Sequence, residues 1–133
     1  DSHLNSPWSV EQINAGADVI YHAAGTTGHG VFEAARDMGI SAIGVDSDQY
    51  DEMPGVVVTS MIKRVDVAVF NAVLAVGEGS FTGGMRSFGV AEDGVGYVKD
   101  GPHAAAIDDA IRARVAELEG DITAGRIRVP AAR

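Results

Sequence analysis

Three short stretches hold polar residues of the kinds that bind small ligands. The first is a glycine-rich turn at residues 25–30, Gly-Thr-Thr-Gly-His-Gly, between a predicted strand and a predicted helix. Glycine lets backbone N–H groups approach a ligand closely, and the start of a helix favours anions or hydrogen-bond acceptors. The glycines follow neither the dinucleotide pattern G-x-G-x-x-G nor the phosphate-loop pattern G-x-x-x-x-G-K-[ST]. The turn is therefore either a ligand-binding loop of another type or a purely conformational one.

The second stretch is acidic and follows the next predicted strand. Asp46 lies at the carboxyl end of that strand, beside the glycine-rich turn. A carboxylate in this place can accept two hydrogen bonds from a vicinal diol. Asp46 and Asp48 could instead begin a calcium loop, although Tyr50 stands where the EF-hand pattern requires a third ligand. A helix cap or a solvated acidic loop is the remaining interpretation.

The third stretch places Lys63 near the start of a long predicted helix. A cation is electrostatically disfavoured at a helix N-terminus, so this lysine either has a ligand or carboxylate partner or is an ordinary surface residue. The four histidines show no metal-ligand spacing, and the sequence around Ser80 is not the G-x-S-x-G nucleophile elbow. The sequence therefore predicts no catalytic residue and no metal site, and nothing in it requires an enzyme.

Hydrophobic periodicity predicts the elements that must position these stretches. Helices are expected at residues 10–15, 31–38, 65–76 and 103–119. Strands are expected at residues 18–24, 40–45, 56–59, 85–90 and 95–98, the last two as a hairpin. The lone Trp8 is expected in the core. Short strand–helix–strand connections predict parallel strands, so the fold class is α/β, a three-layer sandwich with a mostly parallel sheet.

Composition limits the classes of function. The 133 residues allow one domain or one lobe of a larger protein. The 19 Asp and Glu residues outnumber the 10 Lys and Arg residues and give a formal charge of −9, so no nucleic-acid partner is expected. Cysteine is absent, which excludes disulfides and thiolate sites in this chain. No charged start followed by an apolar run appears at residue 1, so no signal peptide is expected within these residues.

Several motifs, in consistent order along residues 10–130, resemble one protein family. They are GADVIYHAAGTTGHGVFEAA at 16–35, AIGVDSDQ at 42–49, VTSMIKRVD at 58–66, FGVAEDGVGY at 88–97 and GRIRVP at 125–130. They resemble the basic membrane protein family of bacterial surface lipoproteins, of the purine nucleoside receptor type. These are substrate-binding proteins of ABC importers. The resemblance implies one lobe of a type I periplasmic binding protein, similar in fold to ribose-binding proteins.

The resemblance also implies a function and a set of binding residues. It predicts a non-catalytic module that binds purine nucleosides, needs no cofactor and serves an ABC permease at the extracytoplasmic face of the membrane or in the periplasm. By motif, Asp46 and Lys63 would hold the ribose hydroxyls, and Tyr21 would pack against the base. Gly25 and Thr26 would line the cleft, with Thr26 replacing the family's second turn glycine. The alternative is a truncated regulatory or oligomerising protein that kept the lobe and lost transport binding.

Family members are more than twice as long as this chain. The resemblance therefore implies that residues 1–133 form a single α/β lobe, the second lobe with the hinge crossings and tail. The helix within 61–84 would normally pack on the other lobe, so its apolar stripe needs another cover. We therefore expect a homo-oligomer or a partner that supplies the missing lobe.

Overall fold

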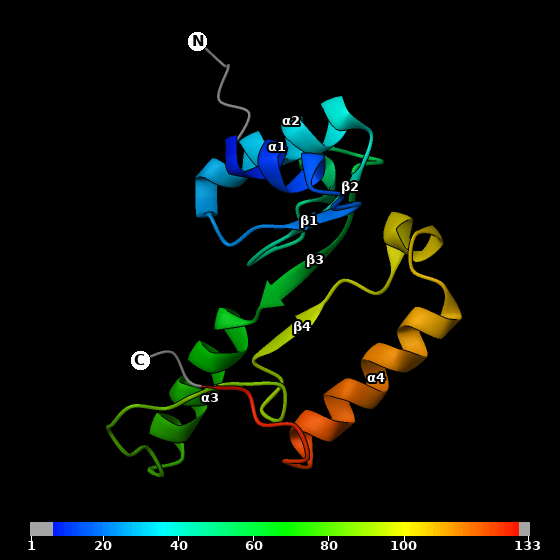
Figure 1. Cartoon of the computed structure of the whole chain (residues 1–133). Coiled ribbons are helices and arrows are strands. Elements are labelled where there is room, and N and C mark those ends of the chain that lie inside the picture. The colour runs from blue at the N-terminus through cyan, green and yellow to red at the C-terminus, as the bar shows by residue number, and fades with distance from the viewer. Residues whose placement is uncertain (1–6, 131–133) are drawn as a thin grey trace. The chain divides into compact units, whose positions relative to one another are not determined.

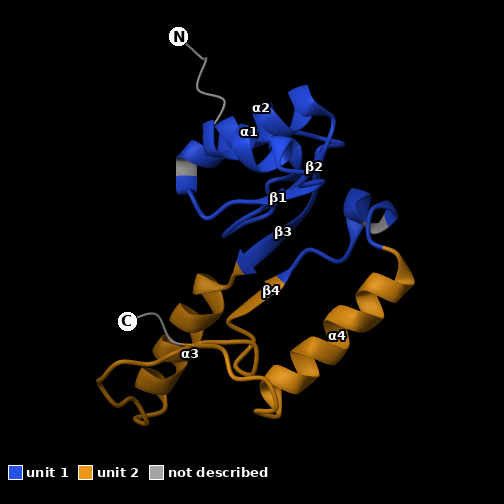
Figure 2. Cartoon of the chain, viewed as in Figure 1, with its two compact units in different colours: residues 1–62, 97–107 blue, residues 63–96, 108–133 orange. Residues whose placement is uncertain are grey.

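The chain divides into two compact units (Figure 2). A computed structural model describes residues 7–130, apart from the side chains of Thr26 and Ala104. Unit 1 contains the described residues up to Ile62 together with Tyr97–Ile107, and unit 2 contains Lys63–Gly96 and the described residues from Asp108 onward. That residues 1–133 form one lobe of a longer protein stays a prediction.

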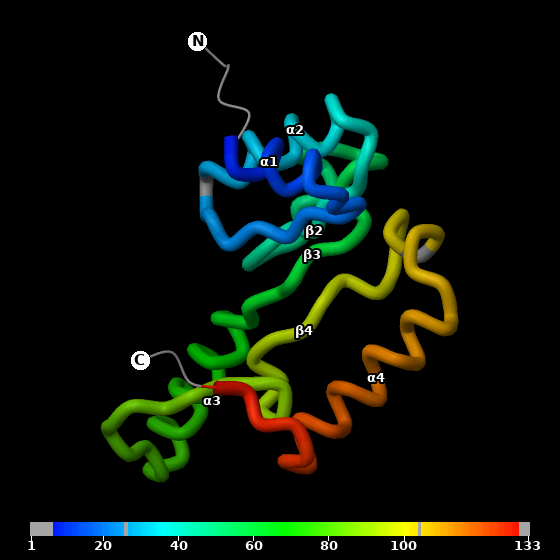
Figure 3. The backbone as a smooth tube through the Cα atoms, viewed as in Figure 1, coloured from blue at the N-terminus to red at the C-terminus, as the bar shows by residue number. Residues whose placement is uncertain are grey.

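Unit 1 is built around parallel strands linked by a helix. Its strands are β1 (Val19–Tyr21), β2 (Ser41–Gly44) and β3 (Val57–Lys63), whose last residue already belongs to unit 2. Its helices are α1 (Pro7–Asn14) and α2 (His29–Met38), with 3₁₀ turns η1 (Gly25–Gly28), η2 (Tyr50–Glu52) and η3 (Gly101–Ala105). β1 pairs in parallel with β2, and β2 with β3, along the path traced in Figure 3. The predicted α/β class with a mostly parallel sheet is therefore confirmed.

The core of unit 1 lies between the sheet and its helices (Figure 1). Ile20 of β1 packs with Ile13 of α1 and with Val31 and Ala34 of α2. A second cluster joins α2 to the other two strands through Phe32, Ala35, Ala42 and Val57. Burial of these apolar side chains is the main force that holds the helices on the sheet.

Helix α2 begins at His29, two residues earlier than its pattern suggested. Its predicted apolar stripe is buried at Val31, Ala34 and Ala35, Phe32 beside it is fully buried, and Met38 is exposed. Gly39 ends the helix in the left-handed conformation, with φ +71°, as its position after the apolar stripe predicts. On β1, Val19 and Tyr21 alternate with buried Ile20 and are exposed.

The predicted hairpin at 85–98 is wrong. Residues 85–90 form no strand, and β4 (Val95–Tyr97) lies next to β3 in the sheet order β1-β2-β3-β4. Within unit 2 the N–H of Arg64 donates to the carbonyl of Gly94 at 2.9 Å, and within unit 1 the N–H of Val98 donates to Ser60 at 3.0 Å. The N–H of Gly94 also donates to the carbonyl of Gly89 at 2.9 Å, which closes a turn over residues 89–94 without making residues 85–90 a strand.

The last predicted helix is interrupted at Asp108. Residues 101–105 form η3, and α4 (Asp109–Thr123) begins only after Asp108, whose carboxylate accepts a hydrogen bond from the N–H of Ile111 at 2.7 Å. Asp108 has extended backbone angles, as an N-cap requires, so one helix over 103–119 is impossible.

Unit 2 has an apolar surface that is not covered within the described chain. Helix α3 (Val65–Gly77) matches the predicted helix, yet none of its residues is buried. Its exposed large side chains are Val65, Val69, Phe70, Val73, Leu74 and Val76. Arg64, just before α3, forms an ion pair with Asp93 at 2.6 Å. None of the helices within residues 7–130 has the length and apolar character needed to cross a membrane.

Trp8 contradicts its predicted place in the core, because it lies on α1 with 76% of its surface exposed. The polar and turn-forming residues around it left no periodic pattern from which its orientation could be derived. The anchoring aromatic residue of unit 1 is instead Phe32, which is 0% exposed.

We expect Phe32→Ala to lower the free energy of unfolding by about 3–5 kcal/mol, because it leaves a cavity between α2 and the sheet. Trp8→Ala, on the same unit, should change it by no more than about 0.5 kcal/mol. Urea unfolding followed by circular dichroism measures both. Similar losses from the two variants would show that the core does not depend on Phe32.

Candidate functional site

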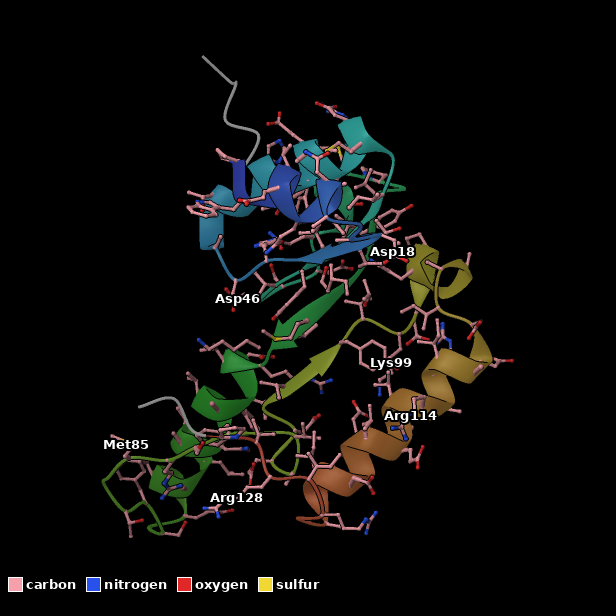
Figure 4. The ribbon with its side chains drawn as sticks, in the orientation of Figure 1. Asp18, Asp46, Met85, Lys99, Arg114 and Arg128 are labelled. Atoms are coloured by element: carbon pink, nitrogen blue, oxygen red, sulfur yellow. The ribbon has the colours of Figure 1, made fainter. Side chains whose placement is uncertain are left out.

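A cavity of about 380 Å³ opens where the parallel strands of unit 1 end. Asp18, just before β1, and Asp46, just after β2, mark opposite ends of the sheet (Figure 4). The lining residues within the described part are Gly25, Val45, Asp46, Ser47, Gln49 and Glu52. Parallel α/β sheets bind ligands at this carboxyl end, and the volume falls in the range of small-molecule sites.

Asp46 occupies a backbone conformation that most residues avoid. Its φ is +69°, and the N–H of Ser47 donates to the carbonyl of Val45 at 2.8 Å, closing a tight three-residue turn around it. Outside glycine, Asp and Asn tolerate this left-handed region best, and even they are strained there. The turn presents the exposed carboxylate of Asp46 at the cavity.

Gln49 holds this turn in place through three hydrogen bonds. Its Oε1 accepts from the N–H of Val45 at 2.7 Å, its own N–H donates to Oγ of Ser60 at 3.0 Å, and its Nε2 donates to Oε1 of Glu52 at 2.9 Å. Gly44 must lack a side chain here, because a Cβ would lie 2.5 Å from Oγ of Ser60. The sequence motif contains Gln49, but sequence reasoning gave it no role.

The two aspartates of the motif have different surroundings. Asp48 Oδ1 accepts from the N–H of Tyr50 at 3.1 Å and lies 3.1 Å from Nε2 of the buried His103 in η3. The Tyr50 ring meets His103 edge to face, with centroids 4.7 Å apart. By contrast, no described residue hydrogen-bonds or pairs with the carboxylate of Asp46. Asp46 is thus available to a ligand, whereas Asp48 is hydrogen-bonded to Tyr50 and lies against His103 of η3.

The cavity presents mainly hydrogen-bond acceptors. Glu52 lines it beside Asp46 and also lies 3.8 Å from Nδ1 of His29. Within residues 7–130, no three His, Asp or Glu side chains gather in a way that would hold a metal ion. Ionised carboxylates accept hydrogen bonds from hydroxyl groups, so the lining suits a hydroxylated ligand.

One titratable group behind the cavity is perturbed. Burial lowers the pKa of His22, whereas the nearby Gln49 side chain and the charges of Glu52 and Asp46 raise it by smaller amounts. Gln49 is close enough to favour the imidazolium, yet no described group completes a hydrogen bond with Nε2 of His22. Among the described residues, Nε2 of His22 is therefore a buried nitrogen without a hydrogen-bond partner.

The structure brings together two of the five predicted binding residues. Gly25 and Asp46 line the same cavity. Tyr21 is half exposed on β1 and is not among the described lining residues, and the side chain of Thr26 lies outside the described part. Lys63 is the exposed last residue of β3 and the first residue of unit 2. The roles of all five stay predictions.

The family model and the relatives found among known proteins point to the same family. The family model of the PnrA-like ABC transporter substrate-binding proteins matches residues 1–132. A CD4+ T-cell-stimulating antigen of Listeria monocytogenes is 37% identical over 134 residues, which is 88% of this chain and 37% of that protein. Basic membrane protein D of Borreliella burgdorferi is 41% identical over 102 residues, which is 74% of this chain and 30% of that protein.

A solved structure shows the same fold over the full length of the chain. It is an ABC transporter system solute-binding protein from Aeropyrum pernix K1, with 26% identity and a TM-score of 0.79 over 100% of this chain and 45% of that one. The chain thus spans less than half the length of these three relatives. Since the family model covers almost every residue, the chain belongs to the family of PnrA-like ABC transporter substrate-binding proteins.

Proposed function

We propose that this chain binds a purine nucleoside and that Asp46 accepts hydrogen bonds from the ribose hydroxyls. The observation that carries the proposal is the unpaired carboxylate of Asp46, held at the cavity in a left-handed turn. Strained backbone conformations are found at binding sites, so a strained aspartate with an unpaired carboxylate at a cavity favours a role in binding. Family membership supports a soluble ligand as the partner, and the acceptor-rich lining supports a hydroxylated one.

Four further residues complete the proposed site. Lys63 would be the second group on the ribose, since no described residue pairs with its ammonium group. Gly25 lines the cavity directly, and Thr26 follows it in η1. Tyr21 would stack on the base, because its ring is exposed on the β1 face opposite the helices.

The proposed activity is binding and release without catalysis. In the complete transporter, a protein of this family would deliver the nucleoside to an ABC permease at the extracytoplasmic face of the membrane. The interaction of such a lobe with a permease needs no covalent step, and the cavity requires only acceptors and backbone N–H groups.

Calorimetry with inosine, guanosine and adenosine tests the proposal. We expect weak binding, because a cavity formed by one unit leaves part of the ligand in water. Asp46→Ala should weaken binding about ten- to hundredfold, since hydrogen bonds to a charged group contribute about 1.5–3 kcal/mol. If no nucleoside at millimolar concentration produced binding heat or thermal stabilisation, the proposal would be refuted. The regulatory or structural alternative would then be favoured.

Asp48→Ala is the matched control for Asp46→Ala. It removes a carboxylate two residues away that contacts Tyr50 and His103 and does not line the cavity. We expect a smaller loss of affinity, which arises only from a looser loop. Equal losses from the two variants would contradict the role assigned to Asp46.

The positive φ of Asp46 also predicts an effect on the stability of the folded chain. We expect Asp46→Gly to have a free energy of unfolding about 1 kcal/mol higher than Asp46→Ala, because glycine adopts a positive φ without steric cost and alanine does not. Asp46→Gly should nevertheless bind nucleoside as weakly as Asp46→Ala. Chemical unfolding and calorimetry on the two variants provide the measurements. An alanine variant as stable as the glycine variant would show that the turn is not strained.

We also propose that the apolar surface of α3 is covered in the assembled protein. Six large apolar side chains of this helix are exposed, and Phe70 is 66% exposed. A single small protein rarely leaves such a continuous apolar patch in water. The cover is either a second copy of this chain or a partner that supplies the other lobe.

Sedimentation of the isolated chain distinguishes these covers. A self-associating chain should show a mass of at least twice 13.8 kDa at micromolar concentration. The double variant Phe70→Glu, Val73→Glu should then sediment as a monomer, whereas Trp8→Glu on unit 1 should not change the mass. A clean monomer at every concentration would exclude self-association and leave the second lobe as the cover.

A further inference from the structure

His22 lies between β1 and the glycine-rich turn, and only 5% of its surface is exposed. Its Nδ1 accepts a hydrogen bond from the N–H of Ala24 at 3.3 Å. Ala24 is the residue on which the turn is anchored, because its carbonyl accepts from the N–H of Thr27 at 3.2 Å and from Oγ1 of Thr27 at 2.7 Å. The imidazole therefore connects the end of β1 to the start of η1, where Gly25 lines the cavity.

The turn is shaped around this ring. A Cβ on Gly28 would lie 2.1 Å from Cε1 of His22 and 2.6 Å from each ring nitrogen, so only glycine allows the contact. On another side the His22 ring meets Phe32 edge to face, with centroids 5.0 Å apart. Phe32 is the central core residue of α2, so the imidazole is fixed between the hydrophobic core and the turn.

We propose that His22 is a positioning residue that holds the glycine-rich turn against the ligand cavity, and that it does so only as the neutral tautomer with its proton on Nε2. The tautomer follows from the hydrogen bond, because a nitrogen that accepts from Ala24 N–H cannot itself carry a proton. A second proton would have to enter at Nδ1. It would break the bond to Ala24 and place two N–H groups face to face. This inference rests on the proposed ligand cavity and adds proton dependence to it.

The charged groups around His22 favour protonation only weakly. From the loop after β2, the carboxylates of Asp46 and Glu52 face it, and Gln49 supplies a polar side chain. From α2, the neighbouring histidine His29 lies 3.8 Å from Glu52 and is itself exposed. Burial opposes these effects and lowers the pKa of His22 below its ordinary value. The neutral form is therefore present at neutral pH, and acid disrupts it.

The lowered pKa of His22 determines how the stability of the folded chain changes with pH. In the unfolded chain His22 takes up a proton near pH 6.5, whereas in the folded chain it does so only at lower pH. The stabilisation from His22 is thus complete above about pH 6.5 and decreases as the pH falls toward the folded pKa. Ligand affinity should fall with further acidification, because the turn that lines the cavity loses its anchor.

His22→Asn separates positioning from titration, because Oδ1 of asparagine takes the place of Nδ1 and does not titrate. We expect His22→Asn to bind inosine like the parent chain at pH 7.5, and His22→Phe, which cannot accept from Ala24, to bind at least about tenfold more weakly. Between pH 7.5 and 4.5, the affinity of the parent chain relative to His22→Asn should fall, by up to about tenfold per pH unit below the His22 pKa. His29→Gln, in the same turn, should keep the parent's pH profile.

Nitrogen-15 NMR of the imidazole rings tests the inference without any ligand. At pH 7.5 we expect the His22 proton on Nε2, and we expect the Thr27 amide to exchange faster in His22→Phe than in the parent or in His22→Asn. A proton on Nδ1, or unchanged Thr27 exchange in His22→Phe, would overturn the role of His22. If inosine bound to no variant but these two signatures were present, the proposed function would fail while the positioning role would stand.

Discussion

Gly44 has no side chain, and the geometry of the cavity depends on that small space. The hydroxyl of Ser60 and the amide of Gln49 fill the volume that a Cβ would need. From there Gln49 satisfies the N–H of Val45, so the chain can leave β2 and turn back sharply at Asp46. A larger residue at position 44 would displace Gln49 first and the left-handed turn next. The buried packing of β3 on β2 and the exposed carboxylate of Asp46 are in this way one connected arrangement.

A similar arrangement joins the core to the other wall of the cavity. Phe32 is set by the packing of α2 on the sheet, His22 lies against Phe32, and Gly28 lies against His22. Each contact tolerates little change in volume, since protein interiors are closely packed. The position of Gly25 is therefore determined by hydrophobic packing several residues away, as well as by the freedom of glycine itself. A cavity built in this way is preorganised before any ligand arrives.

The sequence predicted the parts of the fold that depend on local periodicity. The strand–helix–strand unit, the end of α2 at Gly39 and the helix α3 followed from apolar spacing and glycine positions. The predictions failed where long-range strand pairing or a single helix-capping residue determines which element forms. The apolar residues Met85, Phe88 and Val90 suggested a strand, but residues 89–94 form a turn that Gly94 closes on Gly89, and β4 lies next to β3 instead. Asp108 interrupts an apolar pattern that otherwise continues as one helix, because its side chain caps α4. For the site, spacing indicated Gly25, Asp46 and Lys63, whereas His22 and Gln49 act through contacts that no sequence period encodes.

The positive φ of Asp46 also limits which residues can replace it. A side chain at this position must tolerate the left-handed region and still present an oxygen to the cavity. Glutamate has the same charge, but its longer side chain adopts the left-handed conformation less readily than aspartate or asparagine does. Only asparagine shares both properties, and its amide would add a donor where the aspartate offers acceptors alone. The backbone conformation and the chemistry of the site thus each favour aspartate at position 46. If the turn is kept, asparagine is the one substitution that this position should tolerate.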